Sequence, residues 1–251
     1  MQKINKISNL LNTHVDCLTM EETVIAVDMA IQSGKQIHHA CVNAGKIVSM
    51  QKDPILRESV NSCNLINADG QAIVWASRIL RAETIPERVS GVDLMEKVIE
   101  LAAKKDYKVF FFGAEQEIVE KTINYYSTKY SDKIIAGFRN GYFSEEEEIN
   151  IAKEIAQSGA HILFVAIKTP IKENFLYKHR SYLKNVSFIM GVGGSFDVVS
   201  GKVKRAPLIW QSWGMEWLYR LLQEPRKMWK RYLIGNFVFV RLVFMDWIKR
   251  K

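Results

Sequence analysis

Residues 64–75 read Asn-Leu-Ile-Asn-Ala-Asp-Gly-Gln-Ala-Ile-Val-Trp, and the pattern of this segment organises the rest of the chain. A short apolar run ends at Asp69-Gly70, and a helical pattern of apolar residues begins at once. The pattern indicates a buried strand that passes into a helix, and open parallel sheets bind their ligands at such strand ends. Asp69 is therefore either the N-cap of the following helix or a carboxylate placed to take a proton from a substrate.

The alternation of strand and helix recurs along the whole chain. Helical spacing follows most of the apolar runs, as it does at 20–32, 71–80 and 116–129. The strand-like runs are 37–42, 65–68, 107–112, 133–136, 161–166 and 186–190. We therefore expect an α/β domain of Rossmann-like type, with a mostly parallel sheet of about six strands and helices on both faces.

The composition is that of a folded protein of 251 residues, with 48% apolar and 25% charged residues. The three cysteines are widely spaced, which favours reduced thiols in the cytoplasm. The first residues lack the apolar centre of a signal peptide, and no run of about 18 apolar residues occurs. We expect a cytoplasmic protein without a membrane span.

Positive charge is concentrated at the end of the chain. Residues 201–251 hold 12 of the 35 Lys and Arg residues but only 3 of the 27 acidic ones, so the first 200 residues are almost neutral. Trp, Tyr and Phe alternate with these cations, which is typical of helices that lie on anionic lipid. We expect a catalytic domain at 1–200 and a basic, aromatic, helical appendage at 201–251 that contacts an anionic membrane through 206–251.

Two other interpretations of the appendage remain open. It could be a helix that packs on the core and exposes a solvated basic face. A nucleic-acid-binding arm is less favoured, because a long apolar helix face makes no favourable contact with a phosphate backbone. We therefore expect no nucleic-acid partner.

Several common sites are absent from the sequence. Gly191-Val-Gly-Gly-Ser195 follows a strand, but Phe196 stands where a dinucleotide fingerprint needs its third glycine. No phosphate-binding P-loop motif and no Asp-x-Asp occur, and His38 and His39, as strand neighbours, point to opposite faces. We expect neither a cofactor nor a metal. The N–H groups of Gly193 and Gly194 remain candidates for holding a phosphate.

A set of colinear motifs between about residue 20 and residue 235 resembles the WecG/TagA/CpsF family of glycosyltransferases. The motifs are Val42-Asn-Ala44, Ala68-Asp-Gly70, Glu87-Arg-Val-Ser-Gly-Val-Asp-Leu94, Val109-Phe-Phe-Phe-Gly113, Gly191-Val-Gly-Gly-Ser-Phe-Asp197, Gly201-Lys-Val-Lys-Arg-Ala-Pro207, Glu216-Trp-Leu-Tyr-Arg-Leu221, Gln223-Glu-Pro-Arg226 and Arg231-Tyr-Leu233.

The resemblance implies an inverting, metal-independent transfer of a sugar from a UDP donor. The acceptor would be an undecaprenyl-diphosphate-linked sugar at the inner face of the plasma membrane, where the protein would be peripheral. N-acetylmannosamine, the sugar used in wall teichoic acid synthesis, is the best match for the donor. Family members can be oligomeric, so a homo-oligomer is a further expectation.

The resemblance also implies roles for particular residues. Asp69 falls on the family's proposed base, and Asn43 and Arg88 fall on pocket residues. The remaining expected substrate contacts, which include groups to neutralise the leaving diphosphate, are Gly193, Gly194, Asp197, Arg220, Arg226 and Arg231.

Two positions depart from the family pattern. Lys172 replaces the glutamine of the loop that reads Lys168-Thr-Pro-Ile-Lys-Glu173 here, and Cys41 stands where threonine is common. Both residues are expected to face the sugar or its diphosphate. A cation at position 172 suits a carboxylate or a phosphate, so glucose or a uronic acid such as N-acetylmannosaminuronic acid stays open as the donor sugar.

Overall fold

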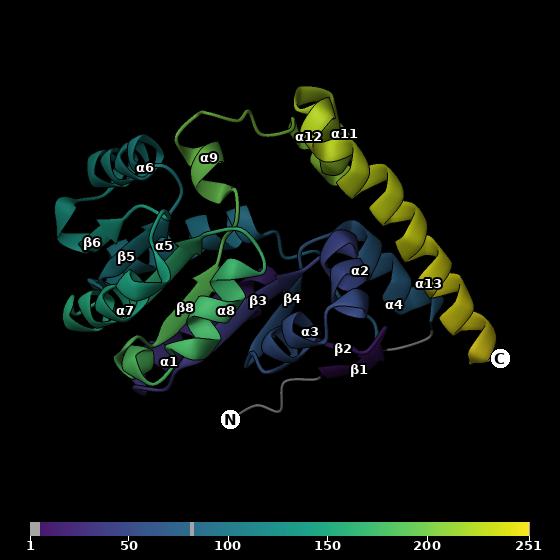
Figure 1. The fold of residues 1–251 in the computed structure, drawn as a ribbon, viewed down its shortest axis with the longest axis horizontal. Coiled ribbons are helices and arrows are strands. Elements are labelled where there is room, and N and C mark those ends of the chain that lie inside the picture. Colours follow the sequence, from purple (N-terminus) through teal and green to yellow (C-terminus); the bar gives the residue numbers. More distant parts are fainter. Residues whose placement is uncertain (1–5, 81–82, 251) are drawn as a thin grey trace.

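The computed structural model describes residues 6–80 and 83–250, without the side chains of residues 6–9, 227 and 231. Its centre is a six-stranded sheet, all parallel, in the order β4-β3-β8-β7-β5-β6 (Figure 1). The strands are β3 (Ile37–Val42), β4 (Leu65–Ala68), β5 (Val109–Gly113), β6 (Ile135–Arg139), β7 (Ile162–Ala166) and β8 (Phe188–Gly191). The expected parallel α/β sheet is confirmed.

Helices cover both faces of this sheet (Figure 1). One face packs against α1 (Met20–Gln32), α5 (Gly91–Lys105), α6 (Gln116–Lys129) and α9 (Ser195–Val199). The other contributes to apolar clusters with α2 (Ala44–Lys52), α3 (Pro54–Asn61), α4 (Gln71–Ile79), α7 (Glu148–Gln157) and α8 (Ile171–Lys178). Three 3₁₀ turns complete this part: η1 (Asp132–Ile134), η2 (Glu145–Glu147) and η3 (Tyr182–Asn185). Successive strand residues alternate between the two faces, which is why both sides of the sheet are apolar.

An antiparallel hairpin of β1 (Lys6–Leu10) and β2 (Thr13–Asp16) precedes the sheet, and the sequence pattern did not predict it. Its turn residues Leu11 and Asn12 have φ values of 53° and 63°, in the left-handed region that leucine rarely adopts. The hairpin is held by tertiary contact, because the Asp16 carboxylate accepts a hydrogen bond of 2.8 Å from the N–H of Ile66 in β4.

The end of the chain is helical, as expected. It comprises α10 (Leu208–Ser212), α11 (Glu216–Gln223), α12 (Pro225–Trp229), a π-helical turn η4 (Lys230–Ile234) and α13 (Gly235–Lys249). The last helix, drawn in yellow in Figure 1, lies beside α2 and α4. Within the described part of the chain, no helix is both long enough and apolar enough to cross a membrane.

The helix α13 has one buried side and one exposed apolar side. Phe239 and Val243 join the apolar cluster of α2, α3 and α4, whereas Phe237, Val240 and Phe244 are exposed. The spacing of three and four residues places each set on its own face of the helix. Part of the tail is therefore core, and the opposite face of α13 is apolar and exposed.

A matched pair of valines tests this division. We expect Val243→Ala to lower the free energy of unfolding by about 2 kcal/mol, because the side chain, only 7% exposed, loses buried methyl groups and leaves a cavity. Val240→Ala, at a position 64% exposed, should change it by less than about 0.5 kcal/mol. Urea unfolding curves measure both values. Equal effects of the two substitutions would show that α13 does not pack as described.

Candidate active site

The polar residues of the predicted site lie where β3, β4 and β8 end. Because β3 pairs in parallel with β4 on one side and β8 on the other, the carboxyl ends of these three strands share one edge of the sheet. Asn43 and Asp69 directly follow β3 and β4, and the turn from Val192 to Gly194 follows β8. In parallel α/β sheets this edge is where ligands bind.

Asp69 is partly exposed and its carboxylate is held by two neighbours. Its Oδ1 accepts a hydrogen bond of 2.9 Å from the N–H of Gly91, the first residue of α5, and its Oδ2 lies 3.4 Å from the Asn43 side-chain amide, which donates to it. The positive end of α5 therefore faces the carboxylate. Asn43 in turn caps α2, because its Oδ1 accepts from the N–H of Lys46 at 3.0 Å. The carboxylate is fixed in direction and still reaches solvent.

The alternative role of Asp69 as the N-cap of the next helix is wrong. The N-cap of α4 is Gly70, which makes no side-chain capping bond. Asp69 instead binds the start of α5, which is brought beside β4 by the hydrogen bond from the Val89 N–H to the Ala68 carbonyl, 2.9 Å long. The local sequence suggested that Asp69 caps α4. In the folded chain Asp69 instead accepts a hydrogen bond from Gly91, the first residue of α5, which lies 22 residues further along the chain.

Cys41 lies beneath this carboxylate and is buried. A β-carbon added to Gly91 would stand 3.5 Å from the Cys41 sulfur and 3.9 Å from the Asp69 Oδ1, so the three residues are packed together. Burial and the nearby Asp69 charge raise the pKa of the Cys41 thiol far above its usual range. The thiol is therefore neutral, and it packs against the residues that hold the Asp69 carboxylate.

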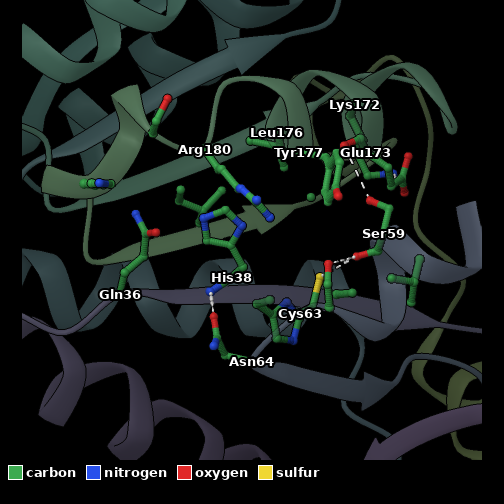
Figure 2. A pocket seen from close by; sticks show the side chains of 18 of the residues that line it. Gln36, His38, Ser59, Cys63, Asn64, Lys172, Glu173, Leu176, Tyr177 and Arg180 are labelled. Atoms are coloured by element: carbon green, nitrogen blue, oxygen red, sulfur yellow. Dashed lines mark hydrogen bonds and ion pairs between the residues drawn. The ribbon is translucent and has the colours of Figure 1, made fainter. Parts of the chain in front are cut away.

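Lys172 is buried in an ionic cluster at the same edge. Its Nζ lies 2.8 Å from the Glu173 carboxylate and donates to the Thr169 hydroxyl at 2.9 Å, and Lys46 reaches the same carboxylate at 3.2 Å (Figure 2 shows Lys172 and Glu173). Burial and the neighbouring Lys46 lower the pKa of Lys172 to about 8. Burial would raise the pKa of Glu173, but Lys46 and Lys172 outweigh it and bring that pKa to about 2. The Glu173 Oε2 has no hydrogen-bond partner among the described residues.

The aliphatic part of Lys172 crosses the end of β8. A β-carbon on Gly191 would stand 2.9 Å from the Lys172 Cδ and still closer to its Cε, so the lysine could keep this path only because position 191 is glycine. Lys172 thereby lies on the face of the sheet covered by α3 and α8, beside the end of β3. Its charge also acts on Cys41.

Arg88 is close to the edge but is turned toward the appendage. Its guanidinium forms an ion pair with Glu216, the first residue of α11. Arg205 joins the same group, since its guanidinium lies 2.6 Å from Asp93 and 3.7 Å from Glu216. The predicted pocket arginine thus forms one of the contacts that fasten the tail to the sheet domain.

The predicted diphosphate contacts lie in two places. Gly193, with φ of 55°, and Gly194 form the turn between β8 and α9, and Asp197 lies in α9 with its backbone carbonyl bound to the Val203 N–H at 2.9 Å. Arg220 on α11 pairs with Glu224 at 2.7 Å, whereas Arg226 on α12 is exposed. The Arg231 side chain lies outside the described residues. The structure therefore places Asp69, Asn43 and Cys41 together, with Lys172 close by and the arginines of the tail on separate helices.

Sequence patterns missed two features of the site. The Gly91 N–H that binds Asp69 and the Glu216 carboxylate that binds Arg88 both come from distant segments, 22 and 128 residues away. No local spacing signals such contacts. Glu173 was identified from the sequence only as the neighbour of Lys172.

Among the described residues, no group of three or more His, Cys, Asp or Glu side chains is placed to hold a metal ion.

A fixed, accessible carboxylate at the carboxyl ends of a parallel sheet is the arrangement of an α/β enzyme that binds its substrate at the sheet edge. The model of the glycosyl transferase WecG/TagA/CpsF family matches residues 8–251, nearly the whole chain. The chain belongs to this family. It is a glycosyltransferase, which moves a sugar from a donor to an acceptor.

Proposed function

We propose that this glycosyltransferase inverts the anomeric carbon, works without a metal, and uses a UDP-sugar donor and a polyprenyl-diphosphate-linked acceptor. The observation that carries the proposal is the Asp69 carboxylate, which is partly exposed at the sheet edge and fixed by Gly91 and Asn43. A general base needs such a defined direction and a free lone pair. N-acetylmannosamine remains the best match for the transferred sugar, on the resemblance of the motifs.

The chemical step assigns a separate task to each group. The acceptor hydroxyl gives its proton to Asp69 while its oxygen forms a bond to the anomeric carbon of the donor sugar. The bond between that carbon and the diphosphate oxygen breaks on the opposite side, and UDP leaves with both electrons. The stereochemistry inverts because attack and departure take place on opposite sides.

The leaving diphosphate needs positive charge or N–H donors. The turn that holds Gly193 and Gly194 lies at the same sheet edge as Asp69, and Arg220 and Arg226 lie on helices α11 and α12, which follow Glu216. Charge-assisted hydrogen bonds from arginine to phosphate are among the strongest that side chains make. We propose that these groups, with Arg231 and Asp197, contact the diphosphate and nucleotide.

The appendage supports a location at the membrane. Its exposed apolar side chains lie on a segment that carries 12 Lys and Arg residues against 3 acidic ones. Such a surface binds anionic lipid through both apolar burial and charge. We propose that 201–251 acts as the membrane-binding appendage of a 1–200 catalytic domain, peripheral at the inner face of the plasma membrane. A homo-oligomer stays a prediction.

The buried cation Lys172 favours one alternative within the same reaction class. A lysine at this edge suits a donor sugar that carries a carboxylate, such as a uronic acid, because that carboxylate could share the ammonium with Glu173. A panel of UDP-sugars, each incubated with an undecaprenyl-diphosphate-linked acceptor and followed by mass spectrometry of the lipid product, distinguishes the candidates. No product from any member of the panel would contradict the proposal.

The pH dependence of donor binding tests the role of Lys172. Its pKa of about 8 means that the ammonium is present at pH 7 and lost as the pH rises through 8. We expect the KM for the donor to rise about tenfold from pH 7 to pH 9, the size of one lost charge-assisted hydrogen bond. Lys172→Gln should show the higher KM at both pH values. A wild-type KM that stays constant over this interval would exclude a contact between Lys172 and the donor.

A further inference from the structure

A cavity of about 430 Å³ opens between α3 and α8, over the middle of β3 and β8 (Figure 2). Its volume is within the range of small-molecule sites in proteins. The floor is formed by His38 and Ala40 of β3 and Ile189 of β8, and the walls come from the two helices and the segment after α8. The cavity extends from Lys172, near the carboxyl ends of the strands, toward Gln36 at the start of β3.

This cavity adjoins the candidate active site at Lys172 but does not include the Asp69 carboxylate. Of the described residues placed at that site, Lys172 also lines the cavity, whereas Asp69, Asn43, Arg88, Gly193 and Gly194 do not. Along β3, His38, His39 and Ala40 line the cavity, whereas the side chain of Cys41 packs in the cluster on the opposite face of the sheet. A ligand bound here would not occupy the space beside the Asp69 carboxylate.

The charges around the cavity favour an anion. Its lining contains four cations, Lys46, Lys172, Arg180 and Lys184, against the single carboxylate of Glu173. That carboxylate is already engaged by Lys46 and Lys172. Among the described side chains, Arg180 and Lys184 form no ion pair. Two unpaired cations at the edge of a cavity attract an anion and hold it with charge-assisted hydrogen bonds.

Arg180 is also placed by its neighbours. Its guanidinium lies over the ring of Tyr177, 4.9 Å from the centroid, and Figure 2 shows it beside the imidazole of His38. Burial and the nearby Arg180 charge lower the pKa of His38, so this histidine adds no charge at neutral pH. Stacking on an aromatic ring keeps the planar guanidinium fork oriented, which suits two-point contact with a phosphate.

The rest of the cavity lining suits a ligand that carries several hydroxyl groups. Ser59, Ser62 and Asn64 supply polar groups along one wall, and Leu176 and Val60 supply apolar surface. The Asn64 Oδ1 accepts from the backbone N–H of His38 at 2.9 Å, which leaves its NH₂ group to donate to a ligand. This combination of a cationic end, hydroxyl-binding groups and a small apolar wall is complementary to a sugar phosphate.

We propose that the cavity is a second ligand site, which binds a small phosphate monoester of a sugar or another polyol through Arg180 and Lys184. Calorimetry on the full chain, with saturating UDP present to fill the donor site, tests the proposal with inorganic phosphate, glucose 6-phosphate and glucuronate as probes. We expect glucose 6-phosphate to bind more tightly than phosphate, and glucuronate to bind at least tenfold more weakly than glucose 6-phosphate.

Variants locate the site. Arg180→Gln and Lys184→Gln should each weaken glucose 6-phosphate binding about tenfold, whereas Arg78→Gln, the same change on the exposed face of α4, should leave it unchanged. Asp69→Asn should also leave it unchanged, which separates this site from the catalytic one. No binding of glucose 6-phosphate in the millimolar range, equal binding of glucuronate, or binding that survives both cavity substitutions would each overturn the proposal.

Discussion

Replacing Asp69 with asparagine is expected to lower kcat for sugar transfer by about 10²- to 10⁴-fold, the usual contribution of a positioned general base. The fold should persist, because the asparagine carbonyl can still accept the hydrogen bond from the Gly91 N–H that Asp69 Oδ1 accepts now. The loss should appear in kcat with little change in the KM for the donor, since the carboxylate acts on the acceptor hydroxyl in the transition state.

Asp106→Asn is the matched control for this experiment. Asp106 is exposed and lies at the C-terminal end of α5 with φ of 55°, a conformation that asparagine tolerates. The Asp106→Asn variant should keep the wild-type kcat for sugar transfer. Thermal unfolding of both variants checks the fold, and wild-type turnover by Asp69→Asn in a correctly folded protein would refute the role of base.

The second large effect is expected at the membrane. Phe237→Glu combined with Phe244→Glu should weaken binding to anionic vesicles at least about a hundredfold, because burial of each phenylalanine in lipid contributes about 1.5–3 kcal/mol and a carboxylate is also repelled. Both residues lie on the exposed side of α13, where they are 72% and 57% exposed, so the substitutions should not disturb the core. Vesicle sedimentation measures the change.

A control and a second readout keep this result specific. Ile55→Glu places the same charge on an apolar residue of α3 that is 71% exposed, and it should leave vesicle binding intact. The double variant should retain transfer to a water-soluble acceptor with a short lipid chain. If it pellets with vesicles like the wild type, α13 is not the membrane contact. Point substitutions are preferable to deletion of 206–251, which also removes Phe239, Val243 and Glu216 from the folded domain.

The sequence predicted the sheet well because its strands are buried on both faces. Such strands read as continuous apolar runs, and β3 and β4 have the predicted bounds. Apolar runs do not predict the strand order β4-β3-β8-β7-β5-β6. That order depends on the face of the sheet over which each connecting helix passes. The β1–β2 hairpin was missed because its stability comes from tertiary contacts, in which Leu10 and Val15 are buried in the core cluster and Asp16 binds β4, and not from a long local apolar run.

The site was predictable to the extent that it lies at strand ends. Asn43 and Asp69 each follow a short apolar strand, and their proximity follows from the pairing of Val42 with Ala68. The direction of Arg88 could not be predicted, because its partner Glu216 comes from the appendage. The basic composition of the tail likewise indicated a surface segment, yet Phe239 and Val243 are core residues.

The alternation of side chains along β3 has a consequence for how this enzyme tolerates change. One six-residue strand separates two sides of the sheet, with the side chains of His38 and Ala40 on the cavity side and that of Cys41 in the cluster on the opposite face. A single inserted residue would exchange the two sets, because every side chain beyond it would change sides. We therefore expect an insertion within β3 to be more harmful than a substitution of any one of its residues.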